Sequence, residues 1–146
     1  MNTTVEQPVA VACLFTWIGF VCAISFMEAW LKFRAPGVTL PIGLGIGRLV
    51  FAALNKVEWA FAIVVSISVL MHSKFIFIMP NVLLLFIILI LILQTVWLLP
   101  ALDARAELYI QDKPVTTSHL HIWFVVAELI KVTGLFIIAI SFFKQS

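Results

Sequence analysis

Charged residues are scarce in this chain. Lys, Arg, Asp and Glu make up 11% of its 146 residues, whereas a soluble domain averages about 25%. Hydrophobic residues make up 64% and fall in four long runs, which is the pattern of a polytopic membrane protein. The net charge of +2 is small and the basic residues are scattered, so we expect no binding to nucleic acid.

Cysteine and the motifs of common active sites are also scarce or missing. The only two cysteines, Cys13 and Cys22, lie on opposite faces of one predicted helix, about 13 Å apart along its axis, so they cannot form a disulfide with each other. The sequence GLGIG at residues 43–47 does not fit GxGxxG. The sequence also contains no nucleophile–base pair and no HxxxH or CxxC motif. It therefore favours a protein that is not an enzyme, and it identifies no cofactor.

The four apolar runs predict an all-α membrane protein. We expect four transmembrane helices that form an antiparallel bundle and together make one domain over residues 1–146. The predicted spans cover residues 9–33, 44–71, 75–99 and 118–143. Residues 35–43 hold two prolines and two glycines and predict a loop, and residues 72–74 predict a tight turn. The third helix is expected to continue past the membrane to Gln111, before the break at Asp112.

The distribution of Trp, Lys and Arg predicts the orientation. Three tryptophans mark one interface as an aromatic belt: Trp30, Trp97 and Trp123. Apart from deeper residues that could be functional, four basic residues lie near this interface and two near the opposite one: Lys32, Arg34, Arg105 and Lys113 against Lys74 and Lys144. The positive-inside rule makes the tryptophan-marked side cytoplasmic and places both termini on the non-cytoplasmic side.

Polar residues from several spans gather at one depth near the cytoplasmic interface. The candidate ligand- or ion-binding residues are Glu28, Arg48, Asn55, Glu58, His121, Glu128 and Lys131, with Gln94 at similar depth. Charges inside a membrane usually face other helices, water or a ligand. We expect Arg48, Asn55 and Glu58 to face Glu128, and Lys56 to point away. This cluster predicts proton- or cation-linked transport or the binding of a small ligand.

Two other interpretations fit the same residues. The charges can form local ion pairs such as Glu28–Lys32 and Glu128–Lys131 while the amides make hydrogen bonds between helices, in which case the chain is a structural or assembly subunit of a larger membrane complex. Alternatively, His121 provides a single axial ligand in a haem- or metal-handling redox protein. The GxxxG spacing of Gly43 and Gly47 favours a homo-oligomer or a subunit role within the lipid bilayer.

The layout resembles families of small four-span bacterial inner-membrane proteins. Four spans in 146 residues, the sequence WLLP at the end of the third span and the polar start of the fourth span carry this resemblance. It is a distant likeness to copper-resistance-D-type and protoporphyrinogen-oxidase-J-type bundles, and it implies a bacterial inner membrane. Haem-binding members of that group place a histidine inside the first span, and residues 9–33 contain none, so no site residue follows from the resemblance.

Overall fold

The computed structural model describes residues 3–72 and 79–145, and this part of the chain is almost entirely helical. Its elements in order are strand β1 (Thr3–Val5), helix α1 (Pro8–Val21), the π-helix η1 (Cys22–Glu28), α2 (Ala29–Leu31), the 3₁₀-helix η2 (Lys32–Arg34), α3 (Leu40–His72), α4 (Met79–Leu93), the π-helix η3 (Gln94–Leu98), α5 (Leu99–Ile110), α6 (Leu120–Ser141) and strand β2 (Phe143–Gln145). Several consecutive helices join end to end into longer segments.

Within the described residues, four helical segments are long and apolar enough to cross a membrane. They cover Pro8–Arg34, Leu40–His72, Met79–Ile110 and Leu120–Ser141. The four segments fit a polytopic membrane protein, because each exceeds the roughly 20 apolar residues that span a bilayer. The prediction of a mainly helical protein with four helices long and apolar enough to cross a membrane is confirmed.

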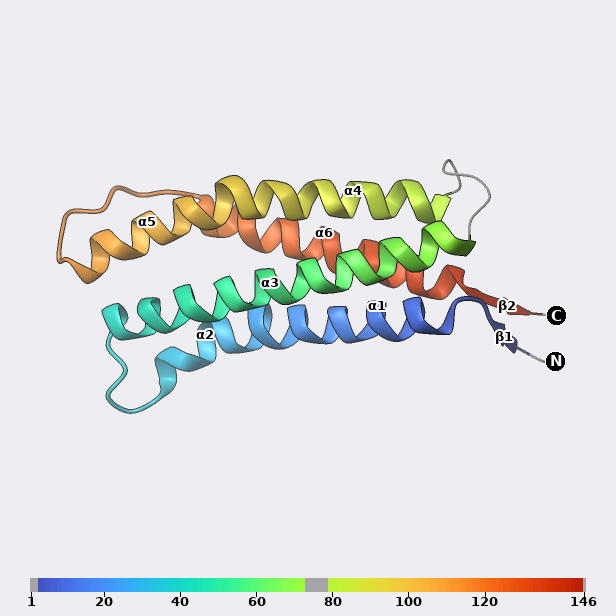
Figure 1. The fold of residues 1–146 in the computed structure, drawn as a ribbon. Helices are drawn as coiled ribbons and strands as arrows, with labels where there is room; N and C mark the ends of the chain where they lie inside the picture. Colours follow the sequence, from blue (N-terminus) through green and yellow to red (C-terminus); the bar gives the residue numbers. More distant parts are fainter. Residues whose placement is uncertain (1–2, 73–78, 146) are drawn as a thin grey trace.

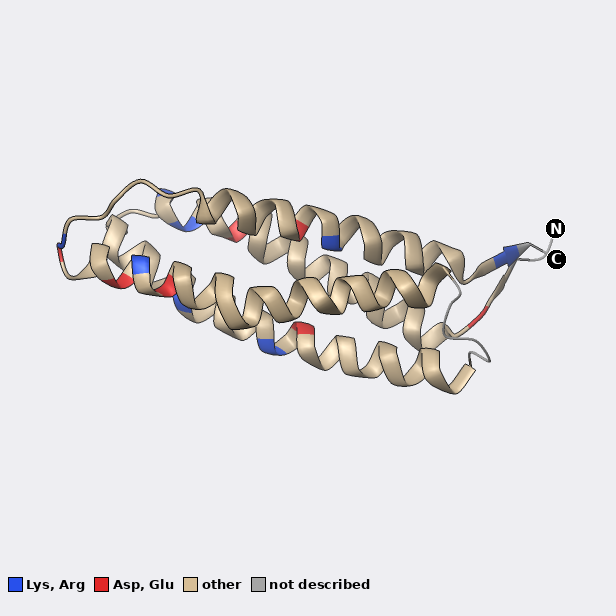
Figure 2. Ribbon diagram, turned by 90° about the horizontal axis from the view of Figure 1, so that it is seen from above, with Lys and Arg blue, Asp and Glu red and all other residues tan. Residues whose placement is uncertain are grey.

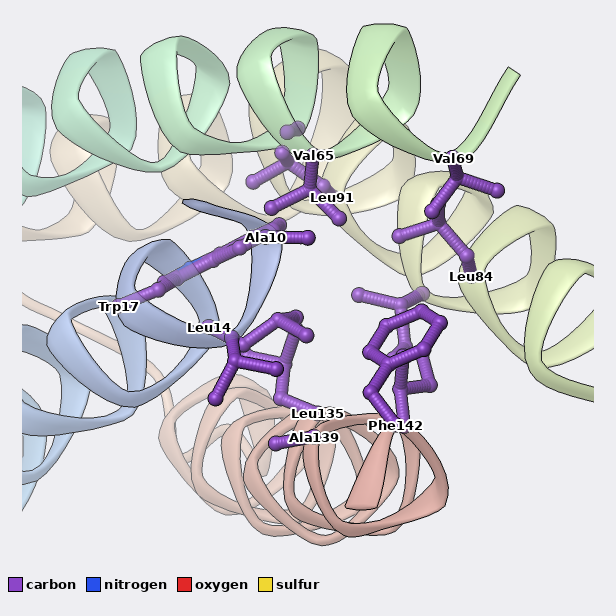
Figure 3. Close-up of a cluster of buried hydrophobic side chains, with 14 of the residues drawn as sticks. Ala10, Leu14, Trp17, Val65, Val69, Leu84, Leu91, Leu135, Ala139 and Phe142 are labelled. Atoms are coloured by element: carbon purple, nitrogen blue, oxygen red, sulfur yellow. The ribbon is translucent and has the colours of Figure 1, made fainter. Parts of the chain in front are cut away.

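The four segments lie side by side along their length (Figure 1). α1 packs against α3 and α6, α4 packs against α6 and α3, and α5 continues along α3. Buried side chains from α1, α3, α4 and α6 meet in the half of the molecule nearest the termini (Figure 3). Trp17, Leu14, Val65, Leu91 and Leu135 are among them. This apolar half holds the helices at fixed positions, and the polar residues lie beyond it.

The predicted helix boundaries need one clear correction. The loop expected to continue through Gly43 ends earlier, because α3 begins at Leu40 and Pro41 lies in its first turn, where a missing N–H costs nothing. The first and fourth spans agree with the prediction within about two residues. Apart from His72, the predicted turn at residues 72–74 lies outside the described residues, as does the predicted start of the third span at residue 75.

The glycines of the predicted GxxxG contact are covered by residues of the same chain. A Cβ atom on Gly43 would lie 2.2 Å from Phe33, and one on Gly47 would lie 3.0 Å from the Lys32 ammonium. Both glycines are buried. The small-residue face of α3 therefore allows the end of the first helical segment to approach closely.

The two ends of the chain meet in a short antiparallel pair of strands. β1 pairs with β2, with Thr4 opposite Lys144, and Lys144 Nζ lies 2.8 Å from Glu6 Oε1. Both termini consequently lie at the same end of the molecule (Figure 1). The sequence predicted this common side but not the strands, since residues 3–5 and 143–145 are too short to give a recognisable pattern.

Gly134 provides a test of the packing between α6 and α4. A Cβ atom there would lie 2.9 Å from Ile87 Cδ1, and Ile87 is fully buried. Gly134→Val should lower the free energy of unfolding by about 1–3 kcal/mol through overpacking, measured by thermal or detergent-induced unfolding. Gly19→Val is the matched control, since nothing lies within 4 Å of its Cβ position; equal losses in both variants would contradict this packing.

Candidate functional site

Charged residues occupy only one half of the four helical segments. In Figure 2 the halves nearer the termini carry no blue or red, whereas the other halves carry both. Within the boundary region between these halves, three charged side chains are almost completely buried: Glu58 is 3% exposed, and Glu128 and Lys131 are 0% exposed. They form the centre of the candidate site.

The Lys131 ammonium lies at the centre of this site and contacts three oxygen atoms. Its Nζ atom lies 2.5 Å from Glu58 Oε1, 2.8 Å from Glu128 Oε1 and 2.7 Å from Gln94 Oε1. An ammonium group has three donors, so all three are satisfied. Lys131 and Glu128 lie on α6, Glu58 on α3 and Gln94 in η3, so one side chain connects three of the four helical segments.

The surrounding residues satisfy the two carboxylates. Trp17 on α1 donates its indole N–H to Glu58 Oε1 at 2.8 Å. Ser25 in η1 donates its hydroxyl to Glu128 Oε2 at 3.3 Å, and Gln94 donates its amide to Glu128 Oε1 at 2.5 Å. All four helical segments therefore contribute to one buried network. We call Glu58, Lys131 and Glu128 the triad, and Trp17, Ser25 and Gln94 its polar partners.

The formal charge of the triad does not balance. Two ionised carboxylates and one ammonium leave one excess negative charge among groups that are at most 3% exposed. An uncompensated charge in a low-dielectric interior costs several kcal/mol, and charged side chains inside a membrane are costly as well. One added proton or one added cation would neutralise the site.

Both π-helices of the described chain supply residues to this network. η1 contains Ser25 and η3 contains Gln94. A π-helical turn accommodates one extra residue and often occurs at functional sites. η3 ends two residues before Pro100, which lies in the first turn of α5, and the missing N–H of Pro100 removes one hydrogen bond of the α-helical ladder. The widened turns set the direction from which Ser25 and Gln94 reach the carboxylates.

A second polar group lies one turn along α3 from the triad. Asn55 Nδ2 donates to Thr95 Oγ1 at 2.9 Å, and the indole N–H of Trp59 donates to the same oxygen at 3.0 Å. Thr95 in turn donates to Leu91 O at 2.7 Å. These bonds connect α3 to η3, so Asn55 contributes to contact between helices, one of the roles the sequence suggested.

Arg48 does not face the triad, and that expectation was wrong. Its guanidinium pairs with Asp103, at 2.5 Å between Nε and Oδ1, and with Glu107. Both acids lie on α5, which runs beside the first turns of α3. The sequence pattern placed Arg48 and Asn55 on one helical face, and this face meets the third helical segment, through Thr95 in η3 and Asp103 on α5. Asn55 therefore contacts Thr95 and not Glu128, so that expectation was also wrong.

The other predicted site residues also lie outside the triad. Glu28 forms the expected local pair with Lys32, at 3.2 Å. His121, a candidate binding residue, is exposed and does not contact the triad. Lys56 is exposed and points away from the triad, as predicted. Of the seven candidate residues, the structure brings together Glu58, Glu128 and Lys131.

A cavity of about 520 Å³ lies toward the end of the molecule opposite the termini, and none of its lining residues belongs to the triad. Asn55 and Thr95 line it, and they are close in sequence to Glu58 and Gln94 respectively. Most of the remaining wall is apolar, while Arg48 and His121 also line it. The volume lies in the range of small-molecule sites.

Sequence reasoning missed Trp17, Ser25 and Thr95. A tryptophan or a small hydroxyl residue inside an apolar run is ordinary in a transmembrane helix, so neither attracts attention. Trp17 could have been found from its hydrogen-bond donor, because an indole N–H in the middle of a span, far from any interface, needs an acceptor.

No group of three or more potential metal-binding His, Cys, Asp or Glu side chains occurs within residues 3–72 and 79–145. Both cysteines are free, as predicted. No family model, curated protein or solved structure matches the chain. The resemblance to copper-resistance-D-type bundles stays a prediction.

Removal of the Lys131 charge should destabilise the protein strongly. Lys131→Met leaves two buried carboxylates without their ammonium, and we expect a loss of about 3–5 kcal/mol in the free energy of unfolding. The triple variant that also carries Glu58→Gln and Glu128→Gln should recover most of this loss. Lys144→Met, which breaks an exposed pair, should cost less than about 1 kcal/mol. Similar losses for the two single variants would contradict a buried charge network.

Proposed function

We propose that this chain is a proton-binding membrane protein in which the triad links proton uptake to transport or to the binding of a small ligand. The observation that carries the proposal is the burial of two carboxyl groups, Glu58 and Glu128, around a single ammonium, that of Lys131. One proton on the two carboxylates makes the network electrically neutral. Polar groups of this kind inside a membrane typically mark proton or substrate pathways.

A proton suits this site better than a metal cation. Hard cations such as Na⁺ or Mg²⁺ need several oxygen ligands around a shared position. Here the Lys131 ammonium already occupies the position between Glu58 Oε1, Glu128 Oε1 and Gln94 Oε1. A second cation would lie against this ammonium, and repulsion between like charges opposes that arrangement.

Proton binding would also change the contact between helices. The Lys131–Glu58 bond joins α6 to α3, whereas Lys131–Glu128 lies within α6. A proton on Glu58 removes the ionic part of the α6–α3 contact, and a proton on Glu128 leaves it intact. Movement of one proton between the two carboxylates therefore biases α3 and α6 between a tight and a loose arrangement.

In the membrane, the four segments form an antiparallel bundle with both termini on the non-cytoplasmic side. The side-by-side helices and the common position of the termini support this arrangement. α3 has 33 residues, or about 50 Å of helix, and thus exceeds a hydrocarbon core of about 30 Å. Its first turns, with Arg48, would lie in the cytoplasmic interface, and Trp30, Trp97 and Trp123 are all exposed, as an aromatic belt requires.

Infrared spectroscopy tests the shared proton. The wild-type protein at neutral pH should show the C=O stretching band of a protonated carboxyl group that is shielded from water. Glu58→Gln and Glu128→Gln should each abolish this band, because either variant leaves one carboxylate balanced by one ammonium. Glu28→Gln, which alters the pair with Lys32 instead, should keep it.

The proposal fails if the wild-type protein lacks the band at neutral pH. It also fails if either triad variant retains the band, since the proton would then belong to a carboxyl group outside the triad. Equal unfolding temperatures in the three variants would show that any spectral difference does not come from loss of the fold.

Labelling of single cysteines tests the orientation. In a Cys13→Ala, Cys22→Ala background, Asp112→Cys should react with a membrane-impermeant maleimide only from the cytoplasmic side. Lys144→Cys should react only from the opposite side. Asp112 lies in the turn after α5, Lys144 lies in β2, and both are exposed. Reversed labelling would overturn the orientation, and labelling of both from one side would overturn the four-span arrangement.

A further inference from the structure

The 520 Å³ cavity combines an apolar wall with a basic edge. Phe51, Leu99, Leu102 and Ala106 supply apolar surface from α3 and α5. Its charged lining residues are Lys32, Arg48, Lys56 and Asp103, and His121 also lines it. A cavity with this composition suits a molecule that has an apolar body and one charged end.

The ion pairs of the charged lining residues decide whether the charged end of such a ligand should be negative or positive. Lys32 pairs with Glu28, and Arg48 pairs with Asp103 and Glu107, so these cations are neutralised. Asp103, the only acid among the lining residues, is used in the Arg48 pair.

Lys56 is different from the other cations that line the cavity. Within the described residues it has neither a carboxylate partner nor a hydrogen bond, and the same holds for His121. An unpaired ammonium at the edge of a membrane is favourable only with water or an anion beside it.

We propose that the cavity binds a small amphipathic anion, namely a monocarboxylate with an aromatic or short aliphatic body. The carboxylate would pair with Lys56, and the body would pack against Phe51 and Leu102; His121, which also lines the cavity, would be a further donor. The ring of Phe51 is already held edge-on by Phe124, with 5.1 Å between centroids, so this surface is preformed.

The cavity and the triad are connected through two residues. Asn55 lines the cavity and lies one turn before Glu58 on α3, and Thr95 lines the cavity and follows Gln94 in η3. Displacement of either residue by a ligand moves a neighbour of the triad. This inference therefore deepens the proposed function and rests on it: a monocarboxylate is the ligand whose binding the triad would link to a proton.

Calorimetric titration of the purified protein in detergent tests the ligand class with three probes of equal size. Benzoate is anionic, benzamide is neutral and benzylamine is cationic. Benzoate should bind with a Kd at least about tenfold lower than either of the others, as expected for one charge-assisted contact. Lys56→Gln should remove most of this difference, and Lys113→Gln, in the loop after α5, should leave it unchanged.

A second pair of variants tests the location. Ala52→Phe fills part of the cavity that Ala52 lines and should weaken benzoate binding about tenfold or more. Ala53→Phe is the control, because Ala53 is the next residue on α3, is also exposed and is not among the cavity lining.

Equal affinities for the three probes, tightest binding of benzylamine, or no effect of Lys56→Gln and Ala52→Phe would each overturn the inference. The infrared band of the triad is measured without any probe. If the band is present and benzoate shows no preference, the ligand class is wrong and the proton site stands. If benzoate binds as expected and the band is absent, the proton site is wrong and the cavity is a ligand site without proton coupling.

Discussion

The burial of one ammonium group is the constraint on which the polar half of this molecule depends. Lys131 is completely buried, and its three donors require three acceptors because each unmet donor in this environment costs free energy. Glu58, Glu128 and Gln94 meet the requirement from three helical segments. The positions of α3, η3 and α6 relative to one another follow from these three contacts, and Trp17 and Ser25 add the first segment through the carboxylates.

The apolar half of the molecule makes this polar network possible. Side chains such as Leu14, Val65 and Leu135 are completely buried between the helices, and their close packing fixes the distances across which the charged groups meet. In lipid, apolar side chains give little preference for one helix neighbour over another. Polar contacts therefore select the arrangement, and the apolar packing makes it rigid.

Neighbouring residues of α3 line the cavity and contribute to the triad. Asn55 and Lys56 face the cavity, while Glu58, less than one turn further, faces the triad. Under the proposed function, a residue that contacts a ligand and a residue that holds a proton would share one rigid helix. Since the Lys131–Glu58 bond joins α3 to α6, a change at either place would alter the same contact between helices, and this shared contact would link the two binding events.

The sequence by itself determined the four apolar helices and their approximate ends, because hydrophobic length and helical periodicity are local properties. It also indicated the local ion pair of Glu128 and Lys131. The tertiary structure decided which faces meet: Glu58 contacts α6, whereas Arg48 on the same helix contacts α5. It also decided the roles of Trp17 and Ser25. A single helix does not specify its neighbours, since these depend on packing and polar contacts between segments far apart in the chain.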